Sequence, residues 1–326
     1  METLVSVVVP MHNEEENVAD TLGALSAALS EQGWSFELIP VNDGSTDDTA
    51  TRLAELAEND SRIRPVSYTV NRGRGYALRR GFAQAGGSYV ASMDADLSYT
   101  PETAVRMVAT LLEDPEADIV LASPYMPGGG VAGVPFVRLA ISRVGNWVLR
   151  RSLPQPVWTS TGIVRAYRAP VLRSLDLESD GKEIHLEILS EAMALGYRVV
   201  EIPAVLHTRR KGTSKFRPKA TMSSHLAFTL LERSTWIFTV AGLFLLICGV
   251  GVGLYLMTVY VSGQLNPERP LMTVMVLLFL GGAVALSFSL LALQVLEIRR
   301  NQVRMQADIR RLTHATEAAW PERDER

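Results

Sequence analysis

The amino-acid sequence predicts an α/β domain with a mostly parallel sheet, followed by two helices that cross a membrane. Three observations lead to this prediction. Short β-branched runs alternate with helical periodicity over residues 5–93, polar residues follow each run, and residues 234–296 carry only two charges, Glu268 and Arg269. The mean hydropathy of +0.12 therefore averages a water-soluble domain with an apolar hairpin and describes neither.

The soluble part is built from repeated strand–helix units. Strands are expected at residues 5–9, 36–41, 64–70 and 88–93, and helices at residues 17–29, 46–59 and 74–84. Units of this length imply parallel strands joined by right-handed crossovers. Ligands of such sheets bind beyond the carboxyl ends of the strands. Polar segments fall at these ends, namely residues 12–14, 42–43, 71–74 and 94–96.

Two uncharged runs, residues 236–261 and 271–296, follow the soluble part. At about 1.5 Å per residue each would span roughly 39 Å, more than the ~30 Å hydrocarbon layer of a bilayer. A buried hairpin in a soluble core is the alternative, but helices of this length and polarity are rare there. Basic residues flank the outer ends of both runs. The positive-inside rule then predicts a cell-membrane protein with two spans, whose soluble domain and both termini are cytoplasmic.

The predicted organisation has four parts. They are a soluble domain at residues 1–217, a juxtamembrane amphipathic helix at 218–235, two transmembrane helices at 236–296 and a cytoplasmic helical tail at 297–326. Apolar residues in the tail follow an a/d spacing for three heptads or fewer, with Gln302 and Thr316 in the seam. This spacing leaves two readings open, a helix that pairs between subunits of a homo-oligomer and a solvated helix.

Composition excludes several classes of protein. Cys248 is the only cysteine, which rules out an internal disulfide framework. A net charge of -3 argues against a nucleic-acid partner. The first strand leads into the acidic segment 10–15 instead of the glycine fingerprint of dinucleotide-binding enzymes. A nicotinamide-dependent dehydrogenase is therefore excluded.

Two carboxylates, Asp94 and Asp96, stand two residues apart at the end of the fourth strand. In an extended chain, side chains at this spacing point the same way, so both can bind one ion. Carboxylates in this arrangement suit a hard divalent cation that also binds substrate phosphates. A solvated turn or a helix cap is the alternative for an isolated Asp-x-Asp. Its position beside three other polar strand ends favours the metal site.

In these and neighbouring motifs, the chain resembles glycosyltransferase family 2, in the branch of dolichyl-phosphate mannose synthase and bacterial polyprenyl-phosphate glycosyltransferases. The resemblance rests on six motifs in order, at residues 9–15, 41–47, 71–75, 93–97, 196–203 and 209–215. It implies a GT-A fold, a nucleotide-sugar donor, a divalent metal (Mg²⁺ or Mn²⁺) and inversion at the anomeric carbon.

The resemblance also assigns roles to individual residues. Those implied to bind the donor are Pro10, His12, Glu14, Asp43, Arg74, Asp94 and Ser214. It implies that Asp94 and Asp96 hold the metal, and that Asp96, Arg209 and Lys215 are catalytic. Cations near the diphosphate would offset the charge of the leaving group. A basic patch attracted to anionic lipid is the second reading of residues 209–211.

The membrane hairpin favours a lipid acceptor, because a soluble acceptor would not require an anchor. A polyprenyl phosphate fits, since its tail lies in the bilayer and its phosphate at the interface. A phosphate is already ionised at neutral pH and needs no general base. Residues 135–151 form a basic amphipathic segment that suits a membrane surface. The resemblance places the lipid phosphate here, which makes Arg138 and Arg143 the candidates; a surface helix with solvated arginines is the alternative.

These features predict a membrane-anchored inverting transferase that moves a hexose from a GDP- or UDP-sugar to dolichyl or undecaprenyl phosphate. The alternatives are the same chemistry on another membrane lipid or glycan, and an inactive scaffold. The chain departs from the family where Ser98 replaces a frequent glutamine, which leaves the third metal ligand open. It also departs at Asn42, at Pro124 and at residues 159–162, so the identity of the sugar is left open.

Overall fold

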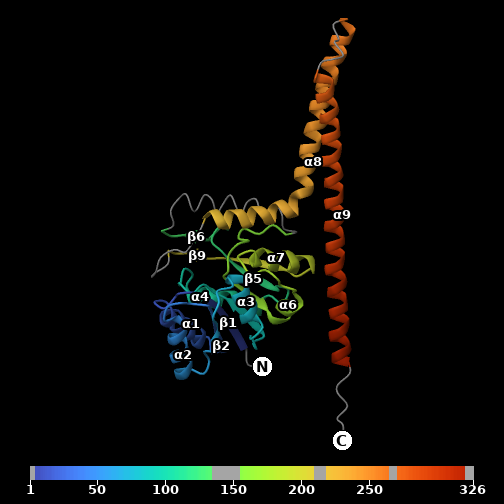
Figure 1. The fold of residues 1–326 in the computed structure, drawn as a ribbon. Helices are drawn as coiled ribbons and strands as arrows, with labels where there is room; N and C mark the ends of the chain where they lie inside the picture. Colours follow the sequence, from blue (N-terminus) through green and yellow to red (C-terminus); the bar gives the residue numbers. More distant parts are fainter. Residues whose placement is uncertain (1–3, 134–154, 209–217, 264–269, 320–326) are drawn as a thin grey trace. The chain divides into compact units, whose positions relative to one another are not determined.

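The computed structural model describes residues 4–133, 155–208, 218–263 and 270–319 (Figure 1). The chain divides into two compact units. One comprises Met1–Thr221 with Ala307–Arg326, and the other comprises Met222–Gln306.

A seven-stranded sheet forms the centre of the first unit, with the strand order β3-β2-β1-β4-β7-β5-β8. Every neighbouring pair is parallel except the two pairs that involve β7. The strands are β1 (Leu4–Met11), β2 (Ser35–Asp43), β3 (Val66–Tyr68), β4 (Tyr89–Ser92), β5 (Ile119–Ser123), β7 (Arg165–Arg168) and β8 (Val199–Pro203). A smaller parallel pair joins β6 (Gly130–Val131) to β9 (Val205–Leu206). The prediction of a mostly parallel α/β domain is confirmed.

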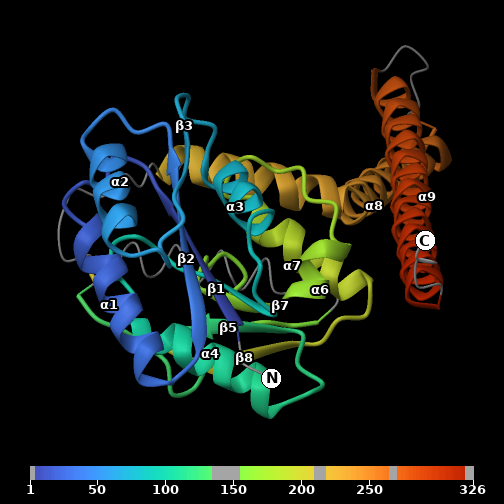
Figure 2. The ribbon, with the colours of Figure 1, turned by 90° about the horizontal axis from the view of Figure 1, so that it is seen from below.

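Helices cover both faces of this sheet (Figure 2). One face carries α1 (Val18–Glu31), α2 (Thr49–Asn59) and α4 (Pro101–Glu113), whereas α3 (Arg74–Phe82) and α6 (Ala169–Ser174) lie on the other. Helix α7 (Ile184–Ala194) also belongs to this unit. The chain runs outward from β1 to β3 and then crosses back to β4. A right-handed return of this kind places α3 on the opposite face.

The central strands are buried on both sides, as expected for a sheet covered by helices. Val5, Val7 and Val8 of β1 have no exposed surface, and neither do Leu38 and Ile39 of β2. In the observed register, β1 pairs along its whole length with β2 and over Val5–Val8 with β4. The polar residues that follow each strand are thereby held at one edge of the sheet.

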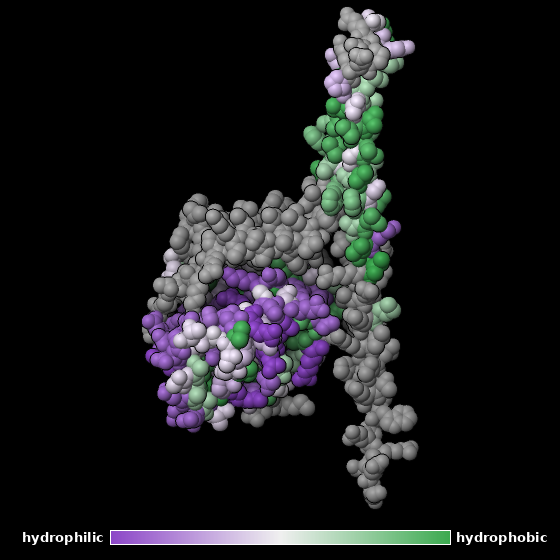
Figure 3. Space-filling view, viewed as in Figure 1, coloured by the Kyte–Doolittle hydropathy of each residue, from purple (hydrophilic) through white to green (hydrophobic). Residues whose placement is uncertain are grey.

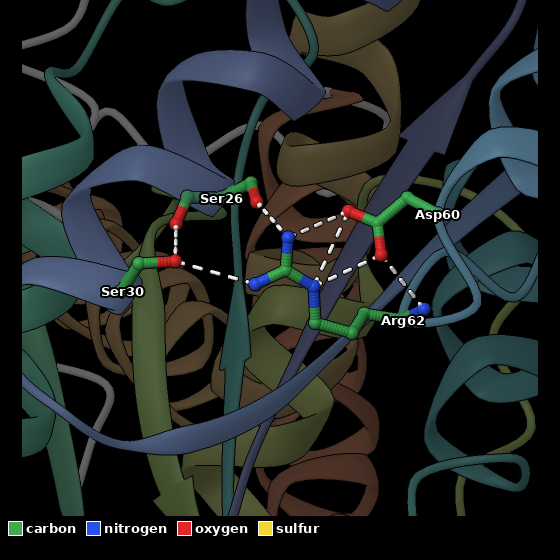
Figure 4. Close-up of polar contacts among 4 residues, drawn as sticks. All are labelled: Ser26, Ser30, Asp60 and Arg62. Atoms are coloured by element: carbon green, nitrogen blue, oxygen red, sulfur yellow. Dashed lines mark hydrogen bonds and ion pairs between the residues drawn. The ribbon is translucent and has the colours of Figure 1, made fainter.

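A polar cluster joins α1 to the loop between α2 and β3 (Figure 4). The Arg62 guanidinium donates to the Ser26 and Ser30 hydroxyls and to the Asp60 carboxylate. Its carbon also lies 4.6 Å from the centre of the Phe36 ring. The cluster is solvent-exposed, so its electrostatic contribution is small. Its main effect is to orient the loop.

The second unit contains most of two long helices, α8 (Pro218–Val261) and α9 (Pro270–Ala319). Each contains a segment long and apolar enough to cross a membrane, Phe238–Val261 and Pro270–Val295. Only 17% and 11% of the most apolar windows are buried within the protein, whereas the core helix of a soluble protein would be mostly covered. Figure 3 shows this apolar surface on the described part of both helices. The protein is therefore membrane-anchored.

Small residues bring the two helices together. A Cβ atom added to Gly242 would lie 3.0 Å from the Gly282 carbonyl oxygen, and the converse distance is the same. The Thr239 and Ser289 hydroxyls share a 2.6 Å hydrogen bond at the same interface. Close backbone approach and interhelical hydrogen bonds are the usual means by which helices associate in lipid. The predicted juxtamembrane helix (218–235) and the start of the first predicted transmembrane helix belong to one continuous helix, α8. The boundaries of the four predicted parts stay a prediction.

Candidate active site

The strand order reverses at β1 and β4, which are neighbours in the sheet but connect outward in opposite directions (Figure 2). In open α/β sheets such a reversal is the usual place of a ligand-binding crevice, beyond the carboxyl ends of the two strands. The described part of the predicted site gathers at this edge. Residues 12–14 follow β1, Asp43 ends β2, residues 71–74 lead into α3, and residues 94–96 follow β4.

Asp43 organises the β1–β3 side of this edge of the sheet. Its carboxylate is 4% exposed and accepts the Arg72 amide at 2.8 Å and the Gly73 amide at 3.0 Å. Its carbonyl oxygen lies 2.9 Å from His12 Nδ1 and accepts the Asn71 side-chain amide at 3.2 Å. The His12 tautomer with a proton on Nδ1 satisfies this contact. Asp43 thus fixes both the ring orientation of His12 and the loop that carries Arg74.

The loops after β1 and β2 are linked by further hydrogen bonds. The Glu14 amide donates to the Thr49 hydroxyl at 2.9 Å, and the Glu14 carboxylate accepts the Asn17 amide group at 2.7 Å. Asn13 has a left-handed backbone (φ 51°), which asparagine tolerates better than most residues, and its side-chain oxygen accepts the Thr46 amide. Pro10 pairs in register with Val41. The residues predicted to bind the donor therefore lie on a rigid frame.

Asp94 and Asp96 lie beside this frame. Asp94 Oδ1 is 3.4 Å from Arg74 Nη2, so the structure brings together two residues that are twenty positions apart in the sequence. Burial and the Asp94 charge raise the pKa of the neighbouring Tyr99 phenol. Asp96 is 8% exposed, and its Oδ1 accepts the Ser98 amide at 3.0 Å. The loop is held from α1 by a 2.7 Å hydrogen bond from the Thr21 hydroxyl to the Ala95 carbonyl.

Two carboxylates at one strand end fit a hard divalent cation, which prefers oxygen ligands. Within the described residues, no three His, Cys, Asp or Glu side chains form a metal-binding group. The rest of the coordination would therefore come from substrate phosphates, water or groups outside that set. The segment after β9 (Val205–Leu206) adjoins this loop, because the His207 amide donates to the Ser98 carbonyl at 2.8 Å.

Three backbone donors at the start of α3 already have partners within the protein. The Gly75 and Tyr76 amides both donate to the Asp180 carbonyl, at 2.8 and 3.2 Å, while the Gly73 amide donates to Asp43. A helix N-terminus binds phosphate through amides that lack other partners. These three amides are therefore not available to a ligand. Five predicted residues, Arg138, Arg143, Arg209, Ser214 and Lys215, lie outside the described residues.

Solved structures define the class of fold. Glucosyl-3-phosphoglycerate synthase from Mycobacterium tuberculosis in complex with UDP superposes with a TM-score of 0.54 and 26% identity, over 71% of this chain and 80% of that chain. The same enzyme in complex with Mn²⁺, UDP and glucosyl-3-phosphoglycerate gives a TM-score of 0.52 and 22% identity, over 71% of this chain and 78% of that one. The fold is therefore GT-A-like.

Residues 6–176 match the family model for glycosyl transferase family 2, and the chain belongs to this family of glycosyltransferases. The dolichol-phosphate mannosyltransferase of Pyrococcus furiosus is 32% identical over 217 residues, which are 66% of this chain and 60% of that protein. The polyprenol monophosphomannose synthase of Mycolicibacterium smegmatis is 33% identical over 216 residues, 64% of this chain and 79% of that protein. The chain thus aligns with three fifths of the Pyrococcus protein.

Proposed function

We propose that the protein is an inverting hexosyltransferase that transfers a sugar from a GDP- or UDP-hexose to a polyprenyl phosphate in the membrane. The observation that carries the proposal is the Asp94–Asp96 pair at the β1/β4 crevice, with Arg74 against Asp94. The relatives in Pyrococcus and Mycolicibacterium carry names of polyprenyl-phosphate mannose enzymes, which makes mannose the first sugar to test. The exposed apolar helices α8 and α9 supply the membrane anchor such an acceptor requires.

The donor occupies the β1–β3 half of the crevice in this proposal. Pro10, His12 and Glu14 line the nucleoside side, and Asp43 keeps residues 71–74 in place. Asp94 and Asp96 would hold a Mg²⁺ or Mn²⁺ ion, which stabilises the negative charge of a leaving diphosphate. The Gly73, Gly75 and Tyr76 amides at the start of α3 already have partners, so we assign the remaining diphosphate charge to Arg209 and Lys215, with Ser214 as a hydrogen-bond donor.

The acceptor phosphate is assigned to Arg138 and Arg143. An ionised phosphate attacks without a general base, so the enzyme has to align it with the anomeric carbon opposite the leaving group. In-line attack of this kind inverts the configuration at that carbon. We place the soluble domain and both termini in the cytoplasm, because the basic flanks of the hairpin follow the positive-inside pattern.

The proposal is tested with full-length protein in lipid nanodiscs. UDP- and GDP-hexoses are screened against one polyprenyl phosphate with Mg²⁺ or Mn²⁺, and lipid-linked sugar is measured. Asp96→Asn should reduce transfer by on the order of 100-fold or more, because it removes one charged metal ligand. Glu58→Gln, the same chemical change on the exposed face of α2, should leave transfer unchanged. Full activity of Asp96→Asn would refute the metal assignment, and absence of transfer from every donor would favour an inactive scaffold.

A further inference from the structure

Residues 158–164 form a loop that enters β7 at the site edge of the sheet. Because β7 is antiparallel, its first residue, Arg165, pairs with Ser92 near the end of β4 and with Leu121 of β5. The loop therefore lies between the segment 94–96 and the end of β5. The Ser92 hydroxyl donates to the Ile163 carbonyl at 2.5 Å, and the Ser123 and Thr159 hydroxyls share a 2.7 Å hydrogen bond. It is on the side of the crevice opposite to the nucleotide-binding loops.

Two charged side chains hold this loop. The Arg165 side chain is 1% exposed and donates to the Ser160 carbonyl through Nη2, to the Gly162 carbonyl through Nε and to the His185 carbonyl through Nη1, at 2.7, 2.7 and 2.8 Å. Glu201 of β8 accepts the amides of Trp158 and Thr159 at 2.7 and 2.9 Å. Main-chain groups at four of the five positions 158–162, all except 161, are thus bound by one guanidinium and one carboxylate.

Burying a guanidinium is costly, because a charge that leaves water loses several kcal/mol of hydration that hydrogen bonds must offset. Burial indeed lowers the pKa of Arg165, opposed by the Tyr167 and Glu201 side chains nearby. An apolar side chain at this inward position would pack the sheet without that cost. Arg165 instead donates hydrogen bonds to the Ser160 and Gly162 carbonyls of the loop that borders the crevice.

We infer that Arg165 is a positioning residue, which together with Glu201 fixes residues 158–162 as the acceptor-side wall of the active site. The inference rests on the proposed transfer reaction. A rigid wall aligns the acceptor phosphate with the sugar, and a misplacement of about 1 Å costs on the order of 100-fold in rate. Loss of the clamp should therefore lower kcat while the donor, bound on the β1–β3 half, keeps its KM.

The other end of β7 provides a matched control. Arg168 also donates to three main-chain carbonyls, those of Leu111, Asp114 and Ala117, at 2.6, 3.2 and 2.8 Å. These acceptors lie at the carboxyl end of α4 and in the connection to the start of β5, at the end of the strands opposite to the crevice. A purely structural role predicts the same behaviour for Arg165→Lys and Arg168→Lys.

The test compares Arg165→Lys, Glu201→Gln and Arg168→Lys in the full-length protein. We expect the first two to lower kcat 10- to 100-fold with the KM for the nucleotide sugar within twofold, and to speed amide hydrogen exchange in residues 156–163. Arg168→Lys should lower the melting temperature but leave kcat and that exchange within twofold. Equal kinetic effects at both ends of β7, or an unchanged kcat in Arg165→Lys, would overturn the inference.

Failure of the proposed function is distinguishable from failure of this inference. If wild-type protein transfers no sugar, the proposed function fails and the assigned effect on kcat fails with it. The exchange measurement still decides whether Arg165 and Glu201 hold the loop. Unchanged exchange in both variants would refute the clamp even in an active enzyme.

Discussion

Replacement of Gly75 by alanine tests how the start of α3, which carries Arg74, is held in place. Gly75 is in the first turn of α3, where residues 179–181 cross directly over it. A Cβ atom added there would lie 2.3 Å from the Ser179 carbonyl oxygen and 2.7 Å from both the Asp180 carbonyl carbon and the Gly181 oxygen. All three are main-chain atoms, which cannot rotate away. The substitution must therefore displace the helix end, and Arg74 with it.

The expected magnitude follows from the contacts. Alanine gains about 1 kcal/mol over glycine in a helix. Against this, the hydrogen bonds from the Gly75 and Tyr76 amides to Asp180 are lost, at about 1 kcal/mol each, and overpacking adds about 1–3 kcal/mol. We expect a net loss of about 2–4 kcal/mol in the free energy of unfolding. In a domain of about 200 residues this lowers the melting temperature by roughly 5–15 °C.

Thermal unfolding and nucleotide binding measure this prediction. Gly23→Ala is the matched control, because Gly23 is also helical and has no atom within 4 Å of an added Cβ. It should raise stability by about 0.5–1 kcal/mol and leave donor binding unchanged. Gly75→Ala should weaken donor binding as well, because Arg74 loses its contact with Asp94. A Gly75→Ala protein as stable as the control, with wild-type donor affinity, would refute the reasoning.

Two further predictions concern the core and the hairpin. Burial alone would raise the pKa of Glu37, but hydrogen bonds from Ser6 and Gly86 and the ion pair with Arg64 outweigh it and lower the pKa. The stability that Glu37 contributes is therefore present above its unfolded pKa of about 4.3 and lost as pH falls through its folded pKa. The difference in melting temperature between wild type and Glu37→Gln should close below about pH 4. A difference that stays constant with pH would contradict this. Gly242→Val should destabilise the α8–α9 pair by about 1–3 kcal/mol in detergent. Gly251→Val should not, because a Cβ atom added at Gly251 has no other atom within 4 Å. Equal effects of the two valines would exclude close packing at Gly242.

The sequence predicted well those elements that local pattern determines. The runs at residues 5–9, 36–41 and 88–93 became β1, β2 and β4, because short apolar runs of this length suit strands buried on both faces of a sheet. The third strand is shorter than expected, Val66–Tyr68 instead of residues 64–70. As an edge strand it pairs with β2 alone, so fewer residues are fixed by a ladder. The predicted position of residues 12–14, 42–43 and 94–96 at the carboxyl ends of the strands agrees with the structure, whereas their role stays a prediction.

Contacts between distant segments could not be predicted from pattern. Nothing local to residues 165–168 indicates that β7 is antiparallel, because alternation of side chains is the same in both directions. The contacts of Asp180 with α3 and of Glu201 with Trp158 join positions separated by about 105 and 43 residues. Their partners are main-chain amides, which every residue possesses. The sequence therefore carries no chemical signal for these pairings.

The measurement that tests the central claim most directly is product analysis with a labelled nucleotide hexose, a polyprenyl phosphate and Mg²⁺ or Mn²⁺. Sugar transfer to the lipid phosphate predicts one nucleoside diphosphate released for each lipid-phosphate hexose formed. The mass of the lipid product should increase by one hexose residue, with the anomeric configuration inverted. Release of nucleoside monophosphate with a sugar phosphate on the lipid, or release of free hexose without a lipid product, would contradict the proposed reaction.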